Sequence, residues 1–233
     1  MDQMKQCETV RTGYYAQVRP EIARLIVGQP KRILEVGCAN GLFRQNITWS
    51  CKYYGVEPFA AAAEAARKNG IEVYEGKYQD VEHLLPEDSF DLIICNDVIE
   101  HMENPWLFLE SIKRKCAKAD DNGKCGMIIG SVPNVRYLLN LVEVLVHRDW
   151  RYVDGGVLDR THLRFFTPKS LRRLFDECGL KVEVLKPSGP DRFRWVKKLM
   201  APFFWIMGVD VLYMQIAFRV VPHTTPSRGG VGT

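Results

Sequence analysis

Short apolar runs that alternate with helical stretches constrain the fold of this chain more than any other feature of its sequence. The runs are rich in β-branched and aromatic residues and occupy residues 31–38, 53–58, 71–76, 90–97 and 126–133. Strands buried on both faces are continuously apolar, and helical crossovers make neighbouring strands parallel. The alternation therefore predicts an α/β protein with a doubly wound, mostly parallel sheet.

Helix starts are visible between and after these runs. Asn104-Pro105 and Thr167-Pro168 each place a capping side-chain oxygen before a proline, which has no amide hydrogen to satisfy. Alanine-rich residues 60–70 form a further helical stretch, and we also expect a helix over residues 41–48. These helices supply the crossovers that the sheet needs.

Length and composition fit one domain. A chain of 233 residues with 46% hydrophobic content can bury one substantial core. We expect residues 1–222 to form this domain and residues 223–233, which are biased towards Pro, Ser, Thr and Gly, to form a disordered tail. The net charge is +4, and the basic residues are scattered along the chain. The sequence lacks the basic stripe interleaved with aromatic residues that would predict nucleic-acid binding.

Cysteine usage and the N-terminal residues bear on the cellular compartment. The seven cysteines form no CxxC pair, and several lie in apolar runs where a thiol behaves as a small hydrophobe. The first fifteen residues are polar and lack the apolar region of a secretory signal. We expect a cytoplasmic protein.

A glycine turn follows the first apolar run. Gly37 and Gly41 lie four residues apart where a strand would pass into a helix. Glycine is needed where the backbone takes a positive φ or approaches a ligand closely. The dinucleotide pattern GxGxxG fails because Ala39 occupies its second glycine position, and the chain has no GK[ST] phosphate loop.

An acid lies where such sheets bind a ribose. Glu57 closes the second run, twenty residues after Gly37. Open α/β sheets place an acid there that accepts hydrogen bonds from ribose hydroxyls. Together with Glu35 in the first run, these residues predict a ligand with a ribose and without a pyrophosphate.

The chain resembles the class I methyltransferases that use S-adenosylmethionine (SAM). The likeness rests on ILEVGCANG at residues 33–41 and on FDLIICNDVIEHMENPW at residues 90–106, and it runs from Tyr14 to Pro222. It implies a Rossmann-like sheet of seven strands with flanking helices, whose last strand is antiparallel and lies at residues 212–221. It also implies a helical insertion at residues 192–207.

The resemblance also implies the cofactor site. Gly37, Asn40 and Gly41 would line the methionine part of SAM, with Glu35 and Cys38 in the same motif, and Glu57 would hold the ribose beside Pro58. Asp80 and Val81 would flank the adenine, Asn96 and Asp97 would lie beneath the sulfonium, and Tyr14 would belong to a lid over the cofactor. Cys38 replaces a common glycine and Asn40 a small residue, but both positions act mainly through the backbone.

A closer likeness suggests the acceptor. Residues 14–26, 131–145 and 158–180 resemble a bacterial subgroup linked with polysaccharide or glycoconjugate biosynthesis. This likeness implies transfer of a methyl group to a small molecule, and the first expectation is a hydroxyl of a sugar or glycoconjugate precursor, which could be a lipid-linked sugar. A quinone, another phenolic or an amine is the alternative acceptor, and an inactive SAM-binding assembly protein is the alternative outside catalysis.

His162 is the candidate catalytic base, because it lies in the connection after the fifth strand, on the acceptor side implied by the resemblance. An alcohol acceptor must lose its proton as the new bond forms, and a histidine can take it. Asp159, Arg160 and His162 could equally form a structural cluster. Trp150, Arg151, Tyr152 and Asp154 could line the acceptor pocket or simply pack the loop.

A metal ion is a further alternative, because Asp97, Glu100 and His101 would share one face of a helix. Glu-His pairs are frequent in the wider fold without a metal, and methyl transfer from a sulfonium requires none. We therefore expect no metal.

The C-terminal part bears on membranes and partners. Pro202, Gly208 and Asp210 interrupt an otherwise apolar stretch, so we expect no transmembrane span. Residues 192–207 mix cations with aromatic and apolar residues and could lie on an anionic membrane surface. Packing of this segment on the domain, or on a second subunit in a homodimer, is the alternative.

Overall fold

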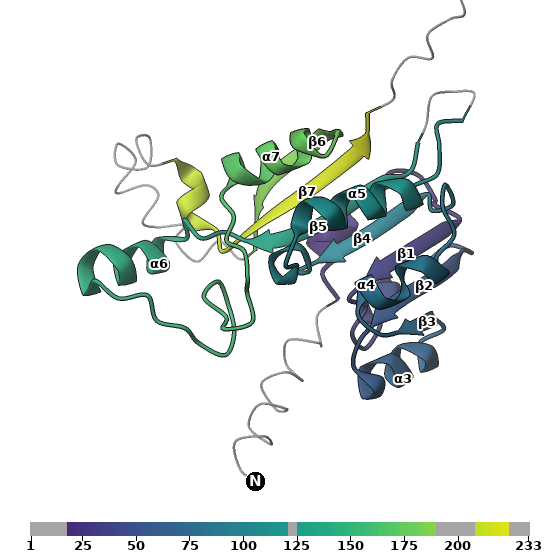
Figure 1. Ribbon diagram of the computed structural model, residues 1–233, viewed down its shortest axis with the longest axis horizontal. Helices are drawn as coiled ribbons and strands as arrows, with labels where there is room; N and C mark the ends of the chain where they lie inside the picture. Colours follow the sequence, from purple (N-terminus) through teal and green to yellow (C-terminus); the bar gives the residue numbers. More distant parts are fainter. Residues whose placement is uncertain (1–17, 121–124, 190–207, 224–233) are drawn as a thin grey trace, which may run out of the picture.

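The computed structural model describes residues 18–120, 125–189 and 208–223. These residues form a seven-stranded sheet with the order β3-β2-β1-β4-β5-β7-β6 (Figure 1). The strands are β1 (Arg32–Val36), β2 (Lys52–Glu57), β3 (Glu72–Glu75), β4 (Leu92–Asn96), β5 (Met127–Pro133), β6 (Leu180–Ser188) and β7 (Gln215–Pro222). The pairs formed among β1 to β5 are parallel, and β7 is antiparallel to both β5 and β6. The predicted fold class is therefore confirmed, including the antiparallel last strand.

Side chains alternate across the sheet and build a core on each face. On one face, Leu34, Ile93 and Ile128 pack with helices α4 (Tyr78–Val81), α5 (Pro105–Lys115) and α7 (Pro168–Glu177). On the other face, Ile33, Ile94 and Ile129 pack with α2 (Pro20–Ala23), η1 (Leu42–Asn46) and α3 (Ala60–Lys68). Strands covered on both sides explain why the sequence runs are continuously apolar.

Both predicted helix starts are confirmed. The Asn104 side chain accepts a hydrogen bond from the Leu107 amide at 3.1 Å at the start of α5. Thr167 and Ser170 form a reciprocal capping box at the start of α7, in which each side chain bonds the other residue's amide. These caps satisfy amides that have no partner inside the helix.

The prediction of a helix over residues 41–48 is wrong. The chain forms only the short 3₁₀ helix η1 and returns to an extended conformation at Ile47. Side chains compete with helical bonding here, because Asn46 Nδ2 donates to the Phe43 carbonyl and Arg44 Nη1 donates to the Ile47 carbonyl. The glycine turn is thus followed by a compact turn instead of a long helix.

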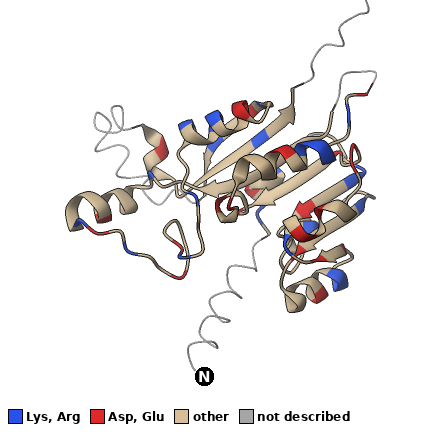
Figure 2. Ribbon diagram, in the orientation of Figure 1, with Lys and Arg blue, Asp and Glu red and all other residues tan. Residues whose placement is uncertain are grey.

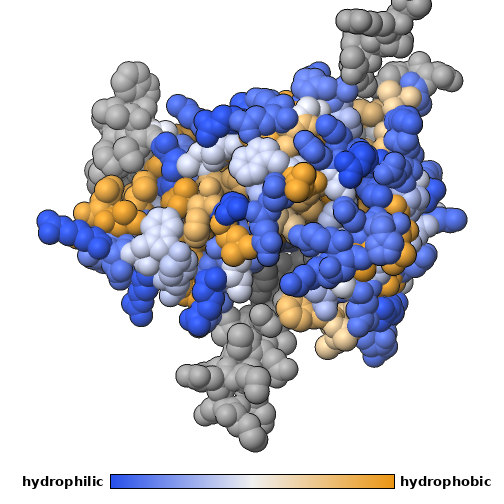
Figure 3. Space-filling model, viewed as in Figure 1, coloured by the Kyte–Doolittle hydropathy of each residue, from blue (hydrophilic) through white to orange (hydrophobic). Residues whose placement is uncertain are grey.

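Helix α6 (Leu138–Val142) continues into the π-helix η4 (Glu143–His147) and projects from one end of the sheet (Figure 1). Leu138 and Leu141 pack on Val211 and Leu212 of the 3₁₀ helix η5 (Val209–Leu212). The opposite face of α6 and η4 leaves apolar side chains exposed, and among these Leu145 is 70% exposed. Figure 3 shows apolar side chains gathered at this end of the molecule.

Several expectations fall on residues that the structure does not describe. These are Tyr14, the insertion at 192–207 and the tail beyond His223; the amide of His223 itself donates to the Gly179 carbonyl at 3.0 Å. Among the described residues, no helix combines the length and apolar character that crossing a bilayer requires. Figure 2 shows basic and acidic residues interspersed along the helices and strands.

Candidate functional site

The turn after β1 holds three residues with a left-handed backbone. Gly37, Ala39 and Gly41 have φ values of 70°, 46° and 75°. A Cβ on Gly41 would lie 2.7 Å from Cδ1 of Ile71, so packing adds to the requirement for glycine there. The amides of Gly37 and Cys38 donate to the Val56 carbonyl, which ties the turn to β2.

Glu57 closes β2 and joins it to this turn. Its Oε2 accepts a hydrogen bond from the Ala39 amide at 2.9 Å, and its Oε1 accepts one from the Phe59 amide at 3.0 Å. Burial raises the pKa of this carboxyl group, while the two amides oppose the shift. Each carboxylate oxygen keeps a further lone pair that could accept a hydroxyl group. The neighbouring Pro58 is exposed.

Two residues of the motif turn their side chains into the core. Glu35 is 4% exposed, and its Oε2 accepts a hydrogen bond from the Tyr53 hydroxyl at 2.8 Å. Burial raises the pKa of Glu35 to about 8. The Cys38 thiol packs against β2, where a Cβ on Gly55 would lie 2.5 Å from its sulfur. Only the backbone of Cys38, as expected, is placed to contribute to a ligand.

The remaining predicted cofactor residues lie at neighbouring strand ends. Asp80 and Val81 belong to α4, directly after β3, with Asp80 exposed and Val81 buried. Asn96 ends β4, and its Oδ1 is buried without a hydrogen-bond partner among the described residues. Asn40 uses its carbonyl to accept from Asn69 Nδ2 at 2.7 Å. The ends of β1, β2, β3 and β4 therefore meet along the edge where open sheets bind ligands.

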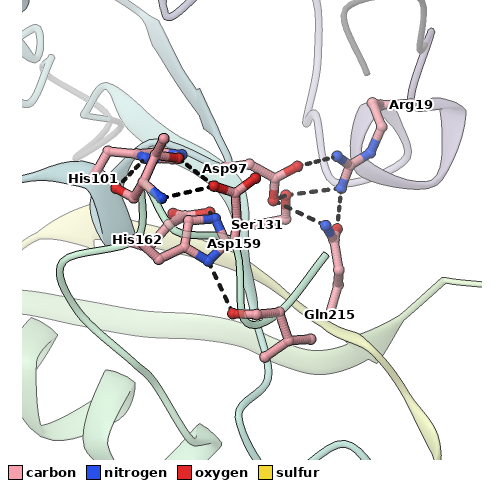
Figure 4. Close-up of polar contacts among 10 residues, drawn as sticks. Arg19, Asp97, His101, Ser131, Asp159, His162 and Gln215 are labelled. Atoms are coloured by element: carbon pink, nitrogen blue, oxygen red, sulfur yellow. Dashed lines mark hydrogen bonds and ion pairs between the residues drawn. The ribbon is translucent and has the colours of Figure 1, made fainter. Parts of the chain in front are cut away.

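Arg19 organises a buried polar network beside this edge (Figure 4). Its Nη1 donates to Asp97 Oδ2 at 2.6 Å, and its Nη2 donates to Ser131 Oγ at 2.8 Å and to the Gln215 side chain. Asp97 Oδ1 accepts from Ser131 and from Gln215, each at 3.0 Å. The network joins the segments before α2 and after β4 to strands β5 and β7.

No local sequence pattern assigns Arg19 to the site, because its partners Asp97, Ser131 and Gln215 are 78, 112 and 196 residues away in the chain. Arg19 has a left-handed backbone with φ of 54° directly before Pro20. The Arg19-Pro20 sequence at the start of α2 therefore directs the Arg19 guanidinium group toward the strand ends. Only a contact prediction between distant segments could have identified it.

A second cluster lies on the other side of Asp97. Glu100 is 1% exposed, and neither of its carboxylate oxygens has a hydrogen-bond partner among the described residues. Nε2 of His162 lies 4.0 Å from Glu100 Oε1, and the rings of His101 and His162 meet edge-on with centroids 4.8 Å apart. Burial raises the pKa of Glu100 and lowers that of His101.

Both histidines are oriented by backbone carbonyls. His162 Nδ1 lies 3.0 Å from the Val157 carbonyl, and His101 Nδ1 lies 3.0 Å from the Thr161 carbonyl. A carbonyl can only accept, so Nδ1 of each histidine is the donor, and Nε2 carries a lone pair whenever the ring holds a single proton. Both Nε2 atoms are thus free to accept a proton or to bind a ligand.

The expectation that Asp97, Glu100 and His101 share one face of a helix is wrong. Asp97 has a φ of 54° and precedes a 3₁₀ helix, η3 (Ile99–His101), so helical spacing does not apply. Asp97 instead faces Arg19 (Figure 4).

The alternative of a structural cluster formed by Asp159, Arg160 and His162 is present in part, because Asp159 bonds residues of this loop while Arg160 pairs elsewhere. Asp159 accepts from the amide and hydroxyl of Thr161, and Arg160 pairs with Asp154 at 2.8 Å. The His162 ring is oriented by the Val157 carbonyl, and the His162 amide donates to the Asp159 carbonyl at 3.0 Å.

The loop proposed for the acceptor is partly anchored. The ring of Trp150 meets that of Phe165 edge-on with centroids 5.1 Å apart. Tyr152 and Arg151 are exposed. Ring packing thus fixes Trp150, and the loop offers an exposed aromatic and a cation beside it.

Known proteins share both the sequence pattern and the fold. A family model described as "Methyltransferase domain" matches residues 10–185. A ubiquinone biosynthesis O-methyltransferase of Rickettsia bellii is 27% identical over 66% of this chain and 63% of that protein. The chain thus spans less than two thirds of this relative. An uncharacterized protein of Methanocaldococcus jannaschii is 29% identical over 75% of this chain and 85% of that protein.

Solved structures agree in fold. A SAM-dependent methyltransferase of Mesorhizobium loti superposes with a TM-score of 0.59 at 14% identity, covering 88% of this chain and 98% of that one. One from Archaeoglobus fulgidus gives a TM-score of 0.59 at 16% identity, covering 90% and 93%.

Proposed function

The chain belongs to the methyltransferase domain family, and we propose that it transfers a methyl group from SAM to a hydroxyl group of a small molecule. The family and the fold imply SAM as the cofactor. The observation that carries the proposal is the coupling of the left-handed turn at Gly37–Gly41 to the Glu57 carboxylate. This pair offers backbone groups and a charged acceptor at one sheet edge.

The residues present fit the cofactor. In our proposal Gly37, Asn40 and Gly41 hold the methionine part, and Glu57 accepts hydrogen bonds from the ribose. The unpartnered Oδ1 of Asn96 is available to a donor at the same edge. SAM, when bound, supplies a methyl group on a sulfonium, which is already a strong electrophile. The protein then has to align the acceptor and exclude water.

Phenolic acceptors deserve the first test. The relative from Rickettsia bellii is named for O-methylation in ubiquinone biosynthesis, and this supports the quinone or phenolic alternative over a sugar. Trp150 and Tyr152 give the loop before His162 aromatic surface that suits a ring. We therefore rank a phenolic hydroxyl first and a sugar hydroxyl second.

Cofactor binding is tested by calorimetric titration of the purified, cofactor-stripped chain with S-adenosylhomocysteine, with NADH as the control ligand. We expect saturable binding of the first ligand alone. Glu57→Ala should weaken it at least tenfold, since a hydrogen bond to a charged group contributes about 1.5–3 kcal/mol. Glu72→Ala, which removes an exposed acid at the start of β3 and away from this edge, is the matched control. Equal affinity of both variants would reject the ribose assignment.

The acceptor side is tested through His162. With isotope-labelled SAM and a panel of catechols, other phenols and sugar nucleotides, His162→Ala should lower turnover by about 10²-fold or more, as for loss of a proton-transfer group. Its affinity for S-adenosylhomocysteine should stay near that of the wild type. His147→Ala, at an exposed histidine of η4, is the control. Full turnover of His162→Ala would remove this residue from the chemistry. Cofactor binding without turnover on any acceptor would instead favour an assembly protein.

A further inference from the structure

Contrary to the expectation from the sequence that no metal binds, we propose that Glu100, His101 and His162 bind one divalent transition-metal ion. Only the catalytic consequence of this inference rests on the proposed function, because metal binding itself is inferred from the arrangement of three side chains. One ligand atom from each of these residues lies within 4.8 Å of the other two. Two imidazoles and one carboxylate form a ligand set that first-row transition metals accept.

The carboxylate needs a partner that the described residues do not supply. Glu100 is almost fully buried, and both of its oxygens are without hydrogen-bond partners. Burying an unsatisfied carboxylate is costly, and buried charges are normally paired or coordinate a metal. Arg19 is engaged by Asp97 and Glu21 and makes no hydrogen bond to Glu100 among the described residues. A bound cation would satisfy Glu100.

The two histidines are prepared as ligands. In metal sites the imidazole typically donates its other ring N–H to a carbonyl or carboxylate, which fixes the tautomer and the ring orientation. His101 and His162 both do this through Nδ1, to the carbonyls of Thr161 and Val157. Their Nε2 lone pairs are left for coordination, and His162 Nε2 already lies 4.0 Å from Glu100 Oε1.

Asp97 is excluded from the ligand set. Arg19 occupies its Oδ2, and Ser131 and Gln215 occupy its Oδ1. The site therefore draws its third ligand from the loop at residue 162, and not from the end of β4. Two backbone amides, those of Leu163 and Arg164, donate to the Glu100 carbonyl and hold this loop against η3.

The donor atoms select the ion. Imidazole nitrogens suit Zn²⁺, Co²⁺, Ni²⁺ and Fe²⁺, whereas Mg²⁺ and Ca²⁺ prefer sites made of oxygen. Three protein ligands leave at least one coordination position open, as catalytic sites do. His101 is the least buried of the three ligands, so the open position would face its side.

The consequence for catalysis follows from the proposed function. A hydroxyl group coordinated by the ion would lose its proton to solvent more readily, because a bound cation lowers the pKa of its oxygen ligand. The oxygen would then form a bond to the methyl carbon as the bond between that carbon and the sulfonium sulfur breaks. His162 would take part as a ligand of the ion, and its loss would still lower turnover.

The test is binding of Co²⁺ to the full chain after treatment with a chelator. We expect one equivalent to bind and to give visible d–d absorption without the intense near-ultraviolet band of a Co–thiolate bond, which separates this site from the seven cysteines. Zn²⁺ should displace the Co²⁺, and excess Mg²⁺ should not. His101→Ala and His162→Ala should each weaken binding at least tenfold. His147→Ala is the matched control, and binding of S-adenosylhomocysteine reports whether each variant is folded.

Each outcome decides the proposal. Loss of the absorption in both ligand variants, with cofactor binding intact, supports it. Retained absorption in both variants, or a thiolate band, overturns it. A wild-type chain that binds S-adenosylhomocysteine but no Co²⁺ also overturns it while leaving the proposed function in place. Failure of the proposed function would appear separately, as loss of cofactor binding in the wild type.

Discussion

Glu35 is the residue whose burial should be measurable as a pH effect on stability. Its pKa is raised from 4.5 to about 8 by burial, with a smaller opposing effect from the Tyr53 hydroxyl. Between these values the native chain keeps the proton while the unfolded chain has lost it. The free energy of unfolding should therefore fall as pH rises through this window, by up to about 1.4 kcal/mol per pH unit. Above the native pKa this contribution should level off.

Urea denaturation of Glu35→Gln at several pH values between 5 and 9 would measure this contribution. Glutamine keeps the shape and the acceptor for Tyr53 but does not titrate, so the variant should lack this part of the slope. Glu72→Gln, at an exposed acid on β3, should keep it. Equal slopes for wild type and Glu35→Gln would show that Glu35 is ionised in the native chain.

Arg19 is the second residue whose loss should be felt throughout the site. The side chains of Arg19 and Asp97 are only 10% and 5% exposed. Arg19→Met would leave the Asp97 carboxylate buried without its cation, which should cost about 3–5 kcal/mol of unfolding free energy. Adding Asp97→Asn to that variant should recover part of the loss.

The comparison variant for Arg19 is Arg67→Met, which breaks exposed pairs with Glu64 and Glu75. It should cost no more than about 1 kcal/mol, as surface pairs do. A similar small cost for Arg19→Met would mean that water reaches Asp97.

Helix α7 is the element whose start depends most directly on one side chain. Thr167→Ala removes the acceptor for the Ser170 amide and should lower the free energy of unfolding by about 0.5–2 kcal/mol. Lys169→Ala changes an exposed residue of the same first turn and should have almost no effect. Urea denaturation compares the two, and equal stabilities would mean that water caps this helix equally well.

Elements were predictable where local chemistry decides them. The caps at Asn104 and Thr167 depend on neighbouring residues, and both were predicted correctly. The segments at 41–48 and 97–101 were not, because left-handed residues and competing side-chain bonds shorten their helices to 3₁₀ turns. Periodicity alone does not register such interruptions.

At the scale of the whole molecule, the sheet and its antiparallel last strand could be predicted from the sequence. The contacts that bring distant segments together at the site could not. Strands that are buried on both faces are visible in the sequence as apolar runs, and the glycine turn indicates the edge of the sheet that binds the ligand. The network of Arg19 and the approach of His162 to Glu100 join segments far apart in the chain, so no local pattern indicates them. The roles of the cofactor residues stay predictions until binding is measured.

The position of β7 gives the protein an order of assembly during its synthesis. Gln215 is the last partner of Arg19 to leave the ribosome, and β7 must then insert between β5 and β6, which are made earlier. The nascent chain can build the β1–β4 half of the sheet first, but Arg19 and Asp97 lack their complete set of partners until Gln215 has been made. Until β7 is made, the domain therefore has an incomplete site and an unfilled place in its sheet, and we expect chaperones to meet it in that state.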